Sequence, residues 1–160
     1  ELRFADNWDN AHWNNKLTTK MIVQMATTNS AAALAMANIL GRLEPNFYAD
    51  LFVVGTSSSN PYDSIVASTP KDVRLVMVGG KILYGDSQLK TAAPQTPACE
   101  DLPLCGTSKF VCVAETSSSS KFNQTYAEIQ STLNNALTDM DSVSGSSYKF
   151  APLAPIYRCP

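Results

Sequence analysis

The chain has 160 residues, of which 44% are hydrophobic and 16% are charged, and this is enough for a domain with a hydrophobic core. Its net charge is −2, with 12 Lys and Arg against 14 Asp and Glu and no basic cluster, which argues against nucleic acid or an anionic membrane as a partner. No apolar run approaches the roughly 20 residues that cross a bilayer, so we expect no membrane span.

The N-terminal part of the chain has the pattern of consecutive helices. Apolar residues of the segment 1–13 recur at helical spacing without a capping residue before them, and we expect this helix to belong to a longer polypeptide. A second helix is predicted to begin near Thr18, whose hydroxyl can accept from the first turn, while Leu17 and Ile22 pack across its start. A polar run then precedes a short Ala-rich helix over residues 30–37.

The central part has the pattern of a small sheet. Leu51–Val54 is a continuous apolar run, which is typical of a strand covered on both faces. Residues 62–67 can form one helical turn. Val73–Val78 alternates around a charged residue, and the segment 81–84 follows it after Gly79 and Gly80, which can adopt positive φ. This pattern predicts a β-hairpin.

The composition changes in the C-terminal part. The segment 88–105 is rich in Pro, Thr, Ala and Cys and indicates a boundary or a wrapping segment, and 109–114 indicates a short strand or a buried helical turn. In the segment 122–140, apolar residues fall at steps of four, three, four, four and three, which predicts an amphipathic helix. We expect the proline-containing tail, 151–160, to lie extended across a surface.

Two short motifs overlap at the start of the predicted amphipathic helix. Thr125 and Glu128 have the spacing of a capping box. Asn123, Gln124 and Thr125 fit the acceptor sequence for N-linked glycosylation, which matters only in a eukaryotic secretory host and also arises by chance in chains of this length.

The four cysteines lie in the last two-fifths of the chain, and they are Cys99, Cys105, Cys112 and Cys159. Their even number and their positions beside proline-rich loops favour two disulfides that tie the tail to the helical region, with three pairings open. The alternatives are a zinc site, which lacks a C-x-x-C motif, and buried free thiols. Disulfides imply an oxidising compartment, so we expect a secreted or periplasmic protein.

No catalytic site is complete in the sequence. The single histidine, His12, lies beside Trp13 and fits a packed or surface residue better than a catalyst, and no third group is placed to orient it as the base of a Cys or Ser hydrolase. No H-x-H, H-E-x-x-H or G-x-S-x-G motif occurs. The carboxylates that could serve as acids or bases are Asp6, Asp9 and Asp63, whereas Asp50 and Asp72 are expected to cap strand edges.

Three stretches together resemble the metal-dependent amidohydrolases. MATTNSAAAL (25–34) is similar to the helix that follows their last barrel strand, and GRLEPNFYADLFVV (41–54) resembles their G-x-L-x-x-G-K-x-A-D-L-x-V strand. DSIVASTPKDVRLVMVGGKILYGD (63–86) is similar to their closing strands, where V-x-x-V-x-V-x-G-K is typical. ELRFADNWDN also looks like the helix after the final metal-site aspartate. The order and spacing agree over about residues 1–86.

The chain departs from this pattern at two places. Asn46 and Phe47 replace the family's Gly-Lys, which puts the type of the local turn in doubt. Ser30 stands where the family often has proline at a helix start, and serine also suits a first turn.

The resemblance implies an enzyme with a (β/α)8 barrel and a small composite β-sandwich. The barrel would bind one or two divalent metals, usually zinc, through an H-x-H pair, further histidines, a lysine or histidine, and an aspartate. The metal would supply a hydroxide that attacks a carbon–nitrogen bond of a small-molecule substrate. By the family's layout these ligands lie upstream of Glu1, so we assign no catalytic and no metal-binding residue to this chain.

These observations predict an α+β fold with three parts. Residues 1–40 would be terminal helices of the barrel, 41–87 strands of a mostly antiparallel sandwich sheet, and 88–160 a disulfide-tied helical extension. The first hypothesis is the C-terminal, non-catalytic part of a hydrolase, whose partner is the barrel of the same protein and which can form a homo-oligomer. It predicts exposed apolar surface on residues 31–36 and on Leu51–Val54. The alternative is a stand-alone secreted structural or binding module.

Overall fold

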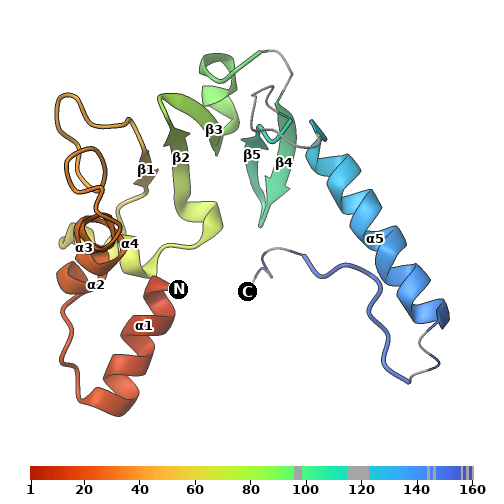
Figure 1. Cartoon of the computed structure of the whole chain (residues 1–160), viewed down its shortest axis with the longest axis horizontal. Coiled ribbons are helices and arrows are strands. Elements are labelled where there is room, and N and C mark those ends of the chain that lie inside the picture. Colours follow the sequence, from red (N-terminus) through yellow and green to blue (C-terminus); the bar gives the residue numbers. More distant parts are fainter. Residues whose placement is uncertain are drawn as a thin grey trace. The chain divides into compact units, whose positions relative to one another are not determined.

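The chain combines helices with antiparallel strands. The computed structural model describes residues 1–95, 99–114, 123–143, 145, 147–155, 157 and 159. The chain divides into two compact units, Glu1–Gly85 and Asp86–Pro160 (Figure 1). Both contain helices and antiparallel strands, which confirms the predicted α+β class. Within the described ranges, no helix is long and apolar enough to cross a membrane.

The first unit contains four short α-helices. They are α1 (Leu2–Trp8), α2 (Thr19–Ala26), α3 (Thr28–Ala33) and α4 (Pro61–Ala67), and α1 continues into a π-helical turn over Asp9–Trp13. As predicted, Thr18 caps α2, because its hydroxyl accepts from the Met21 backbone N–H at 3.2 Å. Arg3 of α1 donates to the carbonyl oxygens of Ala67 and Ser68 at the end of α4. The Arg3 side chain therefore joins the first helix to the fourth.

Gly41 is required where the chain passes back over α3. Its φ is +88°, and a Cβ at this position would lie 2.9 Å from the Cβ of Ala31 and 3.0 Å from the carbonyl oxygen of Thr27. Both the backbone conformation and the close approach exclude a side chain here.

Three antiparallel strands complete the first unit, and they are β1 (Leu51–Val54), β2 (Val73–Val78) and β3 (Lys81–Asp86), whose last residue is the first of the second unit. Strand β2 pairs with β1 on one side and with β3 on the other (Figure 1). Gly79 and Gly80 form the β2–β3 turn with φ of +55° and +81°. The predicted hairpin and its Gly-Gly turn are thus confirmed, and β1 has the bounds that its apolar run predicted.

The second unit contains a hairpin and a long helix, namely β4 (Glu100–Leu104), β5 (Thr107–Val111) and α5 (Tyr126–Val143). Cys105 and Gly106 make the hairpin turn with positive φ. From its composition, the segment 88–105 was predicted to be a boundary or a wrapping segment, so strand β4 and its Pro103 were not predicted. Strand β4 lies at a sheet edge, where proline is tolerated because one side needs no N–H donor.

The first turn of α5 is fully capped. The Thr125 hydroxyl accepts from the Glu128 backbone N–H at 3.1 Å, while the Thr125 backbone N–H donates to the Glu128 carboxylate at 2.7 Å, which is the predicted capping box. The Glu100 carboxylate accepts from the backbone N–H groups of Tyr126 and Ala127. The helix was predicted from residue 122, which lies outside the described residues.

All four cysteines form disulfides, in the pairs Cys99–Cys112 and Cys105–Cys159. This pairing leaves no thiol for the zinc site or the free-thiol alternative. The first disulfide closes the open end of the β4–β5 hairpin, and the second ties the tail to the hairpin turn.

The tail is held to α5 by hydrogen bonds, whereas the second disulfide ties it to the hairpin. The Asp141 carboxylate accepts from the backbone N–H groups of Phe150 and Ala151, and the Asn134 side chain accepts from that of Leu153. The tail is therefore attached to the helical region as expected, but hydrogen bonds make this connection and not the disulfides that were predicted to make it.

Candidate functional site

The acidic residues and the histidine of the first unit do not come together in a site. Within the described ranges, no group of three or more His, Cys, Asp or Glu side chains could hold a metal ion. His12 stacks on Trp8 with ring centroids 3.9 Å apart, and its Nδ1 lies 3.1 Å from the Trp8 carbonyl oxygen. This exposed, stacked ring fits the interpretation as a packed surface residue.

Asp9 is buried, with 1% of its surface exposed, and it fixes the backbone. Its two carboxylate oxygens accept from the backbone N–H groups of Lys16 and Leu17 at 3.1 and 2.8 Å. These bonds close the loop between the π-helical turn and α2. Asp9 is therefore committed to structure, and Asp6 lies half-buried on α1.

Asp63 joins two helices. Its Oδ1 accepts from the Thr19 hydroxyl at 2.7 Å and from the Asn60 side-chain amide at 2.8 Å. Thr19 opens α2 and Asn60 caps α4, so this carboxylate ties the two helix starts together.

Asp50 and Asp72 have the capping roles that their positions predicted. The Asp50 carboxylate accepts from the Gly79 backbone N–H at 2.6 Å and stabilises the β2–β3 turn. Asp72 accepts from both the backbone N–H and the hydroxyl of Thr69, just before β2. Neither group is placed as an acid or a base.

The first unit instead presents a set of exposed large apolar side chains, which we call its apolar surface. Its members are Phe4, Trp8, Trp13, Met21, Met25, Leu34, Leu43, Tyr48, Phe52, Val53 and Val78, each between 44% and 74% exposed. Leu34 is 69% exposed, and on β1 Phe52 and Val53 are 45% and 46% exposed. The expected exposure on residues 31–36 and on β1 is therefore present, except that Ala31 is buried.

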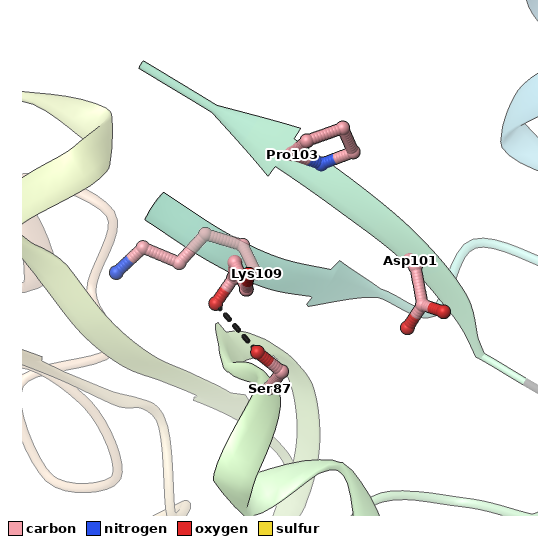
Figure 2. Close-up of a pocket in the computed structure, with 5 residues that line it drawn as sticks. Ser87, Asp101, Pro103 and Lys109 are labelled. Carbon is pink, nitrogen blue, oxygen red and sulfur yellow. Dashed lines mark hydrogen bonds between the residues drawn. The ribbon is translucent and has the colours of Figure 1, made fainter. Parts of the chain in front are cut away.

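The second unit contains an open pocket of about 380 Å³. It is lined by Ser87, Asp101, Pro103, Ser108 and Lys109 (Figure 2). The Ser87 hydroxyl donates to the Ser108 carbonyl oxygen at 2.7 Å, and Figure 2 shows the Lys109 side chain extending away from Asp101. The five lining residues contain no pair of side chains arranged as a nucleophile and its base.

An ion pair lies beside this pocket. The Lys109 Nζ is 2.5 Å from Asp86 Oδ1, and the Lys109 side chain is only 2% exposed. Asp101, an exposed residue that lines the pocket, forms a separate ion pair with the Lys90 Nζ at 2.7 Å. The buried pair was not predicted from the sequence, because Lys109 follows the polar residues Thr107 and Ser108 and a lysine at such a position is usually exposed.

The comparisons with known proteins concern the first unit. The model of the Amidohydrolase family matches residues 3–83. A 5-methylthioadenosine/S-adenosylhomocysteine deaminase of Syntrophomonas wolfei is 34% identical over 76 residues, which are 43% of this chain and 18% of that protein. A protein of the same name from Nitratidesulfovibrio vulgaris is 40% identical over 74 residues, or 42% of this chain and 17% of that protein.

The chain thus spans less than a fifth of the length of these curated relatives. No solved structure matches it significantly. The family match ends close to the boundary of the first unit at Gly85, and the disulfide-containing second unit lies outside it.

Proposed function

This chain belongs to the amidohydrolase family, and we propose that it is the C-terminal part of a metal-dependent hydrolase acting on carbon–nitrogen bonds other than peptide bonds. The observation that carries the proposal is the family match over residues 3–83. In this proposal the chemistry takes place in a barrel of the same protein, and residues 1–40 and 41–87 supply the last barrel helices and part of the sandwich.

The apolar surface of the first unit supports a packing role for this part. Phe52 and Val53 of β1 are nearly half exposed, although the strand has an apolar sequence suited to burial on both faces. Leu34 and Leu43 are exposed still further. Burial of such side chains stabilises an interface by about 25 cal/mol per Å² of apolar area removed from water. The barrel is the partner that we propose for this surface.

The described residues of this chain do not fit a metal ion. The cysteines are consumed by disulfides, and the carboxylates of Asp9 and Asp63 accept hydrogen bonds from the protein itself. We therefore derive no catalytic step within this chain. In the proposal a divalent metal, with zinc as the expected ion, belongs to the barrel.

The substrate class and the compartment of the whole protein are also part of this proposal. The relatives are named as deaminases, which supports a small molecule that loses an amino group. The two disulfides suggest a non-cytoplasmic environment, and we propose a secreted or periplasmic enzyme, which can form a homo-oligomer.

The natural polypeptide provides the test. An antibody raised against the α5 peptide would isolate the protein from its source, and mass spectrometry would give its size. We expect a mass well above the 17.3 kDa of this chain, and ammonia release from aminopurine nucleosides or amides that chelation abolishes and zinc restores. A natural polypeptide of about 17.3 kDa would contradict the proposal.

The second candidate is a stand-alone secreted structural or binding module. The second unit favours it, because this unit carries two disulfides and lies outside the family match. This candidate requires that the isolated chain fold cooperatively as a monomer and bind a ligand without catalysis.

A further inference from the structure

The segment that leads into α5 contains an acceptor sequence that the proposed hydrolase function does not use. Asn123, Gln124 and Thr125 form the single N-x-Ser/Thr sequence of the chain. We propose that Asn123 carries an N-linked oligosaccharide, attached in the secretory pathway of a eukaryotic cell. The proposal does not depend on hydrolase activity.

The position of Asn123 in the folded chain suits a bulky modification. Asn123 is exposed and precedes α5, which begins at Tyr126, so its side chain lies outside the helix. Its φ is +45°, a left-handed conformation that asparagine adopts more readily than most residues. A glycan on its amide nitrogen would therefore extend into solvent without disturbing the helix.

The disulfides supply the second, independent observation. Cys99–Cys112 and Cys105–Cys159 need an oxidising compartment, and the endoplasmic reticulum lumen is such a compartment. It is also where lipid-linked oligosaccharides are transferred to asparagine. Asn123 lies within the loop that the Cys105–Cys159 bond closes, so the same chain segment meets both modifying systems.

The transfer step is a substitution at the first sugar carbon. The Asn123 amide nitrogen forms a bond to C1 of the oligosaccharide and loses one proton to a base of the transferase. The bond between C1 and the diphosphate oxygen of the lipid-linked donor breaks, and the lipid diphosphate leaves with the electron pair. No oxidation or reduction occurs.

The helix cap uses the same hydroxyl as the acceptor sequence. The Thr125 hydroxyl, which belongs to the acceptor sequence, donates to the Glu128 carboxylate at 2.9 Å and accepts from the Glu128 backbone N–H. In the folded chain this hydroxyl is occupied by the helix cap. The helix cap and the transferase therefore compete for this hydroxyl, which favours transfer before α5 is capped.

Peptide mapping of the protein purified from its own source tests the proposal. Trypsin cleaves after Lys121 and Lys149 and releases residues 122–149, which hold the acceptor sequence and no further lysine or arginine before Lys149. We expect most copies of this peptide to carry a hexose- and N-acetylhexosamine-containing mass. Treatment with peptide N-glycosidase should remove it and convert Asn123 to aspartate.

Three variants secreted from eukaryotic cells separate the acceptor from the helix cap. Asn123→Asp should abolish the glycan and leave the helix signal unchanged, because the cap does not involve this side chain. Thr125→Ser should keep both the acceptor sequence and the cap, whereas Thr125→Ala should lose the acceptor sequence and the hydroxyl's bonds in the cap. An unmodified 122–149 peptide from the native protein, or a glycan that persists in Asn123→Asp, would overturn the proposal.

Discussion

Individual carboxylates in this chain hold backbone segments in place. Asp9 accepts two backbone N–H groups from one loop, Asp63 joins two helix starts, and Asp72 caps the entry to β2. A carboxylate satisfied in this way contributes to stability through bonds that cost free energy when either partner is removed. In the first unit, these carboxylates therefore stabilise the fold, although Asp9 and Asp63 were candidate acids or bases by sequence.

The buried pair of the second unit makes a prediction at this scale. Asp86→Asn removes the carboxylate charge that pairs with the Lys109 ammonium, whose side chain is 2% exposed. We expect a loss of about 3 kcal/mol in the free energy of unfolding, because removing one partner of a buried ion pair is costly. The measurement is urea unfolding followed by fluorescence or circular dichroism.

Asp101→Asn is the matched control for Asp86→Asn, because it removes the same charge from a pair whose carboxylate is 78% exposed. The exposed pair should contribute less than about 1 kcal/mol. Equal losses of unfolding free energy in the two variants would show that burial of Lys109 does not determine how much its ion pair contributes to stability.

Some of these roles were predictable from the sequence. Asp50 and Asp72 stand directly before strands, and both were predicted to cap. The Asp72 partner, Thr69, is three residues away, whereas the Asp50 partner, Gly79, is 29 residues away and could not be identified from the sequence. The structural role of Asp9 was not predicted, and Asp9 remained a candidate acid. Its partners, the N–H groups of Lys16 and Leu17, come close to it only because the chain forms the π-helical turn. The sequence has no pattern that marks such a turn.

Secondary-structure elements followed the sequence where a repeat and a cap or turn signal agreed. Helix α5 was predicted from its apolar spacing and its capping box, and the hairpin of β2 and β3 from strand alternation and the Gly-Gly turn. Strand β4 was not predicted, because the composition of 88–105 indicated a wrapping segment and this strand is stabilised by its pairing with β5. Pairing of this kind is a tertiary effect, which propensity alone does not report.

The cap of α5 makes a prediction about pH at the scale of an element. The Thr125 backbone N–H, and then its hydroxyl, donate to the Glu128 carboxylate and lower the pKa of that carboxyl below its ordinary value of 4.5. A lowered folded-state pKa adds stability above pH 4.5, and this stability is lost as the pH falls through the lowered pKa. We expect the helix signal in circular dichroism to decrease on acidification below 4.5.

Glu128→Gln is the control for this titration, since the amide oxygen can still accept from Thr125 but does not titrate. Its acid transition should be smaller than that of the parent chain. Asp141 is a second carboxyl that protonates in acid, and the backbone N–H of Phe150, and more weakly that of Ala151, lower its pKa below the ordinary value of 3.8. The comparison is therefore made in an Asp141→Asn background, and identical acid transitions there would refute the role of Glu128.

At the scale of the whole chain, the two units differ in what stabilises them. The first unit has a sparse core with Ile22, Ala31 and Val66 among its buried apolar residues, and it carries the family match. The second unit is cross-linked by two disulfides, and the longer loop, with a separation of 54, should restrict the unfolded chain by about 4 kcal/mol in the loop-entropy estimate. The sequence predicted two disulfides but left their pairing open, because four cysteines allow three arrangements.

The apolar surface of the first unit makes the prediction that separates the two functional candidates. A chain that packs on a barrel should bind a hydrophobic dye and self-associate when it is purified alone, because apolar side chains such as Leu34 and Leu43 are 69% and 74% exposed. The double variant Leu34→Ser and Leu43→Ser should lower both signals, with a change in unfolding free energy within about 0.5 kcal/mol, because neither side chain is in the core. Val143→Ser, at an 84% exposed position on α5, is the control and should change neither signal. A parent chain that is monomeric and binds no dye would favour the stand-alone module, since nothing on its surface would then need a partner.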